Sequence, residues 1–168
     1  LRTHPRRYPL GRAGDARLSC DQSVGEVPAL VDGEATVAES GAICAYLADR
    51  FPEAELAPRI HEAARGRYLQ WMFFSGNCVE PSYMEKFMNL TVDGSSAGWG
   101  GYDKVIDVLE EAVTPSPWIL GDAFSAADVM IGTDLFFGVR AFKLVAPRPA
   151  FDAYLDRCMA RPAFVRAQ

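Results

Sequence analysis

Residues 27–51 read VPALVDGEATVAESGAICAYLADRF, and this stretch decides the fold of the first part of the chain. The apolar residues up to Val31 predict a strand. Asp32-Gly33 is a tight-turn pair, and residues 35–38 resume the strand composition. A turn pair between two such runs predicts a β-hairpin.

A helix and a linker are expected after this hairpin. From Ser40 the apolar residues recur one or two turns apart on one helical face, and Pro52 ends the pattern. We therefore expect a helix over residues 40–50. Residues 52–60 combine two prolines with charges, which is typical of a linker between domains.

The rest of the chain divides into an irregular start and a helical second domain. Residues 1–23 contain no Val, Ile, Phe or Trp but five arginines, so neither strand nor helix periodicity is sustained there. Every periodic segment over residues 61–168 is helical, which predicts an all-helical domain. The expected fold class is α+β, with a first domain over residues 1–51.

The helix that starts at Ser125 carries a recognisable N-terminal signal. Ser125 and Asp128 have the spacing of a capping box, in which each side chain bonds the other residue's backbone amide. The residues that follow are apolar around most of the helix, which predicts that it lies at the centre of the helical domain. We therefore interpret Asp128 as a buried structural carboxylate and not as a catalytic one.

Composition and charge exclude several classes of partner. Almost half of the 168 residues are apolar (49%), enough for a substantial core, and the net charge of -5 disfavours nucleic acid and anionic lipid. The four cysteines and two histidines match no metal-ligand spacing, so we expect no metal. We see no secretory signal or membrane-spanning apolar run, and free thiols then favour the cytoplasm.

Three stretches in this order and spacing resemble the cytosolic glutathione transferase superfamily, with the bacterial type as the nearest pattern. They are GEVPAL at residues 25–30, ESGAI continuing to YLADRFP at residues 39–52, and GDAFSAAD at residues 121–128. The resemblance covers roughly residues 24–168. It implies a truncated thioredoxin-like, glutathione-binding domain followed by an all-α helical bundle.

The resemblance also implies residues for the glutathione site. Val27 would bond the backbone of the cysteinyl residue of glutathione, with Pro28 holding the turn in the cis form. Ser40, with the first amides of its helix, would bind a carboxylate of glutathione, and Glu39 its ammonium. The alternative for Glu39 and Ser40 is a capping role that serves only the helix.

The long helix after the linker is implied to line the electrophile pocket and to contact a second copy of the chain. We choose Trp71 and Phe74 for the pocket wall, and core packing is the alternative for each aromatic residue there. The apolar surface is larger than one small domain can bury, which predicts a homodimer.

The implied reaction joins the thiolate of glutathione to a small hydrophobic electrophile. We assign no catalytic residue, because Tyr8, Ser19 and Cys20 match no recognisable thiol-activating motif. We therefore expect weak or no conjugation by this chain. Two alternatives stay open: a non-catalytic binding or interaction module, and a glutathione-dependent isomerase or reductive lyase.

Overall fold

The computed structural model describes residues 28–167, which form two compact units. The division falls between Ile43 and Cys44, inside a helix, and each unit is described separately below. The irregular start predicted for residues 1–23 lies outside the described part of the chain. The linker predicted at residues 52–60 stays a prediction about domain organisation.

The first unit contains the predicted hairpin, which is confirmed. Strand β1 (Ala29–Asp32) pairs antiparallel with β2 (Ala35–Ala38), and Ala29 lies opposite Ala38. The turn residues are Gly33 and Glu34 and not the predicted Asp32-Gly33, since Asp32 still pairs within the sheet. Gly33 takes the positive φ of 62° that the tight reversal requires, a conformation open to glycine at little cost.

The predicted helix over residues 40–50 is also confirmed, as α2 (Ser40–Arg50). Phe51 leaves helical geometry, and a short 3-10 turn, η1 (Pro52–Ala54), begins at the proline. Proline ends the helix because it lacks an amide donor and restricts the residue before it.

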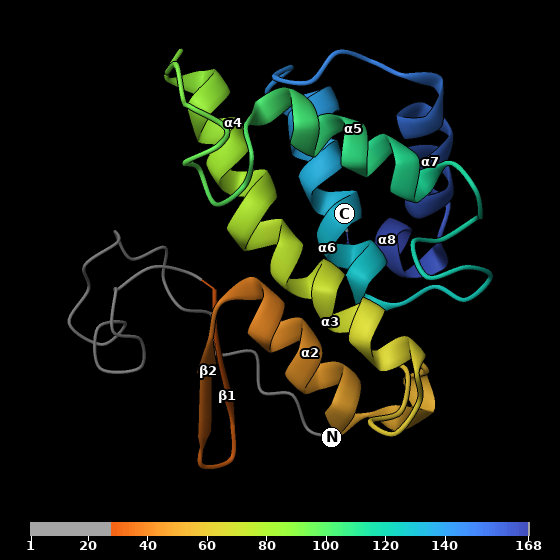
Figure 1. The fold of residues 1–168 in the computed structure, drawn as a ribbon. Helices are drawn as coiled ribbons and strands as arrows, with labels where there is room; N and C mark the ends of the chain where they lie inside the picture. Colours follow the sequence, from red (N-terminus) through yellow and green to blue (C-terminus); the bar gives the residue numbers. More distant parts are fainter. Residues whose placement is uncertain (1–27, 168) are drawn as a thin grey trace. The chain divides into compact units, whose positions relative to one another are not determined.

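The second unit is helical, as predicted, and one long helix forms one side of it (Figure 1). The segments of this helix are α3 (Ala64–Phe74), the π-helical η2 (Ser75–Val79) and α4 (Glu80–Phe87). A proline inside a helix normally interrupts it, because it lacks an amide donor and its ring crowds the preceding turn. At Pro81 the helix instead widens by one residue just before the proline, which accommodates the missing amide and the ring without a break.

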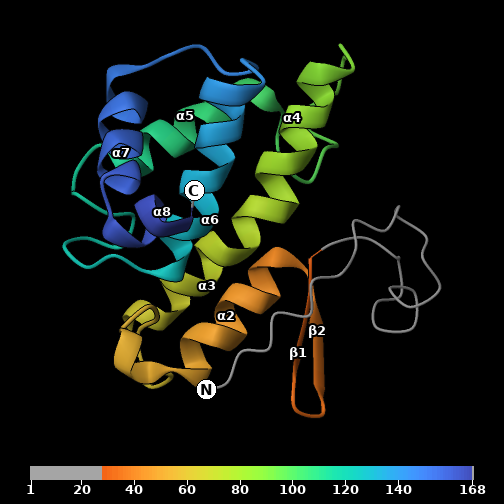
Figure 2. The ribbon, with the colours of Figure 1, turned by 180° about the vertical axis from the view of Figure 1, so that it is seen from behind.

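Helix α6 lies between the long helix and α7, as Figures 1 and 2 show from opposite sides. The remaining segments are α5 (Tyr102–Val113), α6 (Ala126–Leu135), the π-helical η3 (Phe136–Ala141), α7 (Pro149–Met159) and α8 (Pro162–Ala167). The core gathers around α6, and its largest side chains with no exposed surface are Tyr68, Leu109, Ile131, Leu135, Phe151 and Tyr154. Among residues 28–167, no helix has the length and apolar character that a membrane crossing requires.

Candidate functional site

The junction between β2 and α2 has an unusual backbone. Glu39 adopts a left-handed conformation with φ of 70°, which costs a residue with a side chain about 1–2 kcal/mol. Its carbonyl accepts the first hydrogen bond of the helix, 2.9 Å from the amide of Ile43. Glu39 is therefore the residue that turns the chain from strand to helix. Such strained residues concentrate at functional sites.

The start of α2 is suited to an anion. Ser40 and Glu39 are both exposed, and the first turn of α2 contains no acidic residue. The first amides of a helix have no partner four residues earlier, and the helix dipole adds positive potential there. A carboxylate can thus be bound by the Ser40 hydroxyl and these amides, while the Glu39 carboxylate supplies a counter-charge for an ammonium.

The hairpin register brings Pro28 to the same end of the sheet as Glu39. Because Ala29 lies opposite Ala38, their outer neighbours Pro28 and Glu39 both lie at the open end of the hairpin. Pro28 is exposed. Val27, and with it the peptide bond before Pro28, lies outside the described residues. The structure thus brings together three of the four residues chosen for glutathione.

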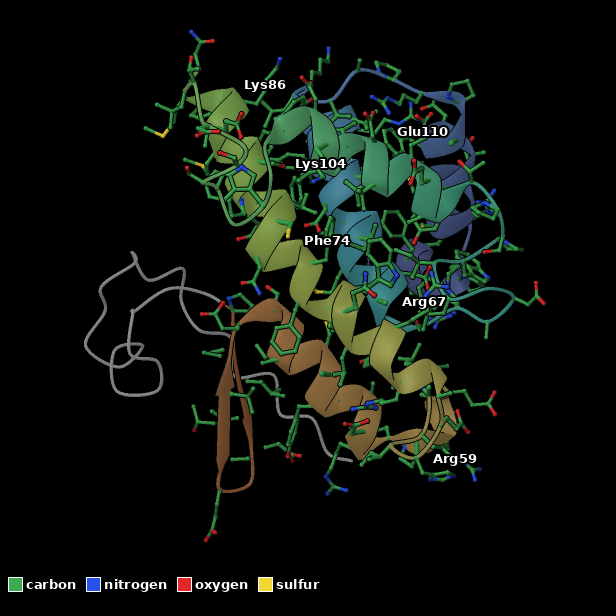
Figure 3. The ribbon with its side chains drawn as sticks, in the orientation of Figure 1. Arg59, Arg67, Phe74, Lys86, Lys104 and Glu110 are labelled. Carbon is green, nitrogen blue, oxygen red and sulfur yellow. The ribbon has the colours of Figure 1, made fainter. Side chains whose placement is uncertain are left out.

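Trp71 and Phe74 belong to α3 in the second unit, and Figure 3 labels Phe74 on the long helix. Their rings meet edge to face, with centroids 5.2 Å apart and planes inclined by 71°. Trp71 is only 4% exposed and packs in the helical core, whereas Phe74 is half-buried. A pocket role for either residue stays a prediction, and Phe74 presents the larger accessible face.

Ser125 and Asp128 form a capping box at the start of α6. Asp128 is 1% exposed, and its carboxylate accepts four hydrogen bonds. One oxygen accepts from the amide and hydroxyl of Ser125, and the other from the amide of Ile119 and the phenol of Tyr154. A carboxylate with this many partners holds the fold and has no free oxygen for chemistry.

A second carboxyl group of interest, the half-buried Asp134, was not found from the sequence. Burial, opposed by the nearby Ser75 hydroxyl and assisted by the negative charge of Glu80, raises the pKa of Asp134 to about 7. Ser75 is fully buried in the π-helical turn η2. The only sequence signal was an acidic residue inside the apolar run of α6, which does not distinguish a buried group from a solvated one.

None of the thiols of Cys44, Cys78 and Cys158 has the lowered pKa of an activated nucleophile, and neither has any of the phenols of Tyr68, Tyr83, Tyr102 and Tyr154. Burial raises the pKa of Cys44 and Cys78, and raises that of Cys158 to about 11. Burial likewise raises the pKa of Tyr68 to about 12. These seven side chains therefore provide no activated thiol or phenol.

Two family models match the chain. The model described as the N-terminal domain of glutathione S-transferases matches residues 5–55, and the one described as the C-terminal domain matches residues 91–157. Together they cover more than half of the sequence. A glutathione S-transferase of Escherichia coli O157:H7, GstA, is 24% identical over 140 residues, which are 82% of this chain and 70% of that protein.

Solved structures agree with the family models. The structure of a sphingomonad glutathione S-transferase complexed with glutathione has a TM-score of 0.73 and 28% identity, and the match covers 93% of this chain and 78% of that one. A glutathione transferase from Methylococcus capsulatus has a TM-score of 0.72 and 28% identity, over 89% and 75% of the two chains. The chain belongs to the glutathione transferase superfamily. Its fold is α+β, with part of a thioredoxin-like domain followed by an all-helical domain.

Proposed function

We propose that this protein binds glutathione at the open end of the hairpin and joins its thiolate to a small hydrophobic electrophile. The observation that carries the proposal is the register of β1 and β2, which places Pro28 beside Glu39 and the start of α2. Family membership and the glutathione complex of the sphingomonad relative support the same ligand.

Glutathione offers three groups to this end of the hairpin. Its cysteinyl backbone is an extended peptide, which we expect to pair with the backbone of Val27. Its γ-glutamyl end carries a carboxylate for Ser40 and the α2 amides, and an ammonium for Glu39. The γ-glutamyl end carries its carboxylate and its ammonium on the same carbon. This arrangement matches Ser40 and Glu39, which are adjacent and would bind groups of opposite charge.

The proposed reaction forms one carbon–sulfur bond. The thiolate sulfur attacks an electrophilic carbon, and a leaving group departs with the electron pair of its bond, or the pair moves onto an acceptor conjugated with that carbon. The protein contributes by holding both reactants near each other. We place this reaction in the cytoplasm, because Cys44, Cys78 and Cys158 are free thiols.

A second candidate function is a binding module without turnover. The observation that favours it is that burial raises the pKa of Cys44, Cys78, Cys158 and Tyr68, so none of these four side chains is activated. Both candidates predict binding of glutathione, and only the first predicts a thioether product with an activated aryl chloride. Product formation above the uncatalysed rate therefore separates them.

Calorimetric titration with glutathione tests the site itself. We expect Ser40→Ala to weaken binding about tenfold or more, because a hydrogen bond to a charged group contributes about 1.5–3 kcal/mol. Ser96→Ala is the matched control, since Ser96 is exposed and its hydroxyl bonds only Asp93. Equal affinity of Ser40→Ala and the unchanged protein would remove Ser40 from the site.

The role of Glu39 is tested with a changed ligand. Glu39→Gln is expected to weaken binding of glutathione but not of its analogue without the amino group, because that analogue lacks the ammonium. An equal loss for both ligands would show that Glu39 acts only through the backbone turn. The proposal would then no longer explain how the ammonium of glutathione is bound.

A further inference from the structure

Two π-helical turns meet at one polar contact between the long helix and α6. Ser75 is the first residue of η2, and Asp134 lies at the end of α6, two residues before η3 begins. Helix α6 packs against both α3 and η2. Single π-turns inside α-helices are frequent at functional sites. Ser75 and Asp134 therefore join two segments whose helical geometry is irregular.

The side chains of Ser75 and Asp134 lie close to each other, but the structure contains no hydrogen bond between them. The Ser75 hydroxyl is near enough to oppose the rise in the pKa of Asp134. Yet neither Ser75 Oγ nor Asp134 Oδ2 has a hydrogen-bond partner among residues 28–167, and both atoms are buried. Leaving buried polar atoms unpaired is costly, and a carboxyl group can supply a donor only when it is protonated.

The groups that face Asp134 disfavour its ionised form. Glu80, at the start of α4, adds a negative charge, and Tyr83 of the same helix contributes a phenol whose pKa is raised mainly by burial. Burial and Glu80 raise the pKa of Asp134 to about 7, so its carboxyl exchanges a proton near neutral pH. Charged and titratable groups on the other elements that pack against α6 interact elsewhere: Arg65 of α3 with Asp49, Arg140 of η3 with Asp152 and Asp156, and Tyr154 and Cys158 of α7 with Asp128.

We propose that Ser75 and Asp134 form a proton-operated latch between the long helix and α6. The protonated carboxyl donates Oδ2–H to Ser75 Oγ and holds η2 against α6. When the proton leaves to water, the carboxylate is repelled by Glu80 and turns toward solvent from its half-buried position, so Ser75 loses its partner. A bond from the Ser75 hydroxyl to the carboxylate offsets only part of the cost of burying the charge, because the pKa stays raised despite it.

Tyr83 confines the effect of the latch to η2. Its phenol donates a 3.1 Å hydrogen bond to the backbone carbonyl of Asp134, and a Cβ on Gly138 would collide with this phenol. The acceptor of that bond is a backbone group, which does not change when the Asp134 side chain gains or loses a proton. Helix α4 therefore stays attached to α6 while η2 loosens. The latch does not depend on the proposed glutathione site, because it shares no residue with that site.

Hydrogen exchange of the amides of residues 75–79 tests the latch, with protection factors compared at pH 5 and pH 8. In the unchanged protein we expect protection in η2, relative to that in α5, to fall about three- to tenfold at the higher pH, because one hydrogen bond is lost. Ser75→Ala should abolish this fall, although Asp134 can still titrate in that variant. Asp134→Asn should abolish it as well, because the amide donates at both pH values.

Ser82→Ala is the matched control, since Ser82 is a fully buried serine of the same long helix. Its hydroxyl donates a 2.7 Å hydrogen bond to the carbonyl of Val79, so the fall in η2 protection should persist in this variant. A fall of the same size in Ser75→Ala, or equal protection of the unchanged protein at the two pH values, overturns the proposal.

A second variant changes the charge beside the latch without touching either partner. Glu80 is exposed, so Glu80→Gln should fold normally and move the pH midpoint of the η2 transition to lower pH, because it removes a negative charge near Asp134. Glu111→Gln, at an exposed position of α5, is the control and should leave the midpoint where it is. An unchanged midpoint in Glu80→Gln would assign the transition to another group and overturn the latch.

Discussion

The phenol of Tyr154 donates a 2.8 Å hydrogen bond to Oδ1 of Asp128, and this bond ties α7 to the first turn of α6. Burial and the adjacent carboxylate raise the pKa of Tyr154, so the phenol remains a donor at all ordinary pH values. The same oxygen accepts from the amide of Ile119, 2.8 Å away, in the loop before α6. One carboxylate thus holds three separate segments together.

Removing this carboxylate is expected to destabilise the helical unit. Asp128→Ala leaves the buried amides of Ser125 and Ile119 without their partner, and each unsatisfied group costs about 1–3 kcal/mol. Tyr154→Phe removes one hydrogen bond and should cost only about 1 kcal/mol. Urea unfolding measures both, with exposed Asp122→Ala as the control. A normally stable Asp128→Ala protein that had lost activity would contradict the structural role.

The raised pKa of Asp134 predicts that the free energy of unfolding falls as the pH rises. Its pKa is 3.8 in the unfolded chain and about 7 in the folded one, so between these values the folded state binds more protons. The contribution of Asp134 is complete below pH 3.8 and is lost progressively up to about pH 7, by at most about 1.4 kcal/mol per pH unit. Asp134→Asn cannot titrate and should remove this slope.

The measurement is the free energy of unfolding at pH 5 and pH 8 for Asp134→Asn and for the control Asp103→Asn. Asp103 is exposed on α5. The slope of the control should equal that of the unchanged protein. An Asp134→Asn protein that retains the full slope would show that another group carries it.

Asp49 and Arg65 join the end of α2 to the start of α3 through two hydrogen bonds of 2.7 Å. The Arg65 bond lowers the pKa of Asp49 below 3.8, so the pair stabilises the fold above that pH and its contribution is lost as acid protonates the carboxylate. Because Asp49 is 43% exposed, we expect only about 0.5–1 kcal/mol. A double-mutant cycle with Asp49→Asn and Arg65→Gln measures the coupling, and a coupling near zero would contradict it.

Apolar residues exposed along the long helix predict a homodimer. Phe73 is 64% exposed and Phe87 72%, and a face of this kind is typical of an interaction surface. Light scattering at micromolar concentration should show a dimer, and Phe73→Glu should shift it to a monomer. Val165→Glu, on α8 and 62% exposed, is the control and should stay dimeric. A monomeric unchanged protein would exclude this interface.

Local sequence patterns were sufficient to predict the hairpin and α2. The signals for these two elements each act over a few residues. They are a glycine at the turn, strand composition on both sides of it, and a proline after the last helical turn. The structure confirms the hairpin and α2. The sequence also located the buried cap at Ser125, because a capping box has a fixed spacing. The left-handed conformation of Glu39 had no comparable signal, since that backbone is normally associated with glycine or asparagine.

Features that depend on distant contacts could not be predicted. The burial of Asp134 depends on the packing of α6 against the long helix, and a cavity around Arg161 depends on how α6, α7 and α8 meet. The residues around Arg161 in the sequence do not distinguish it from a solvated surface arginine. Only the support of Phe124 and Trp118, about 40 residues earlier, distinguishes it.

The π-helical turn at Ser75–Val79 has an evolutionary consequence for the long helix. A π-turn holds one residue more than an α-turn, so it has the form of a single-residue insertion that the helix absorbed. Deleting one residue there would restore a regular helix and leave α4 facing nearly as it does now, whereas a regular α-helix with the same number of residues would rotate everything beyond this turn by about 100° relative to α3, because one residue spans that angle. The faces of α4 and α3 are therefore out of phase in the sequence yet aligned in space.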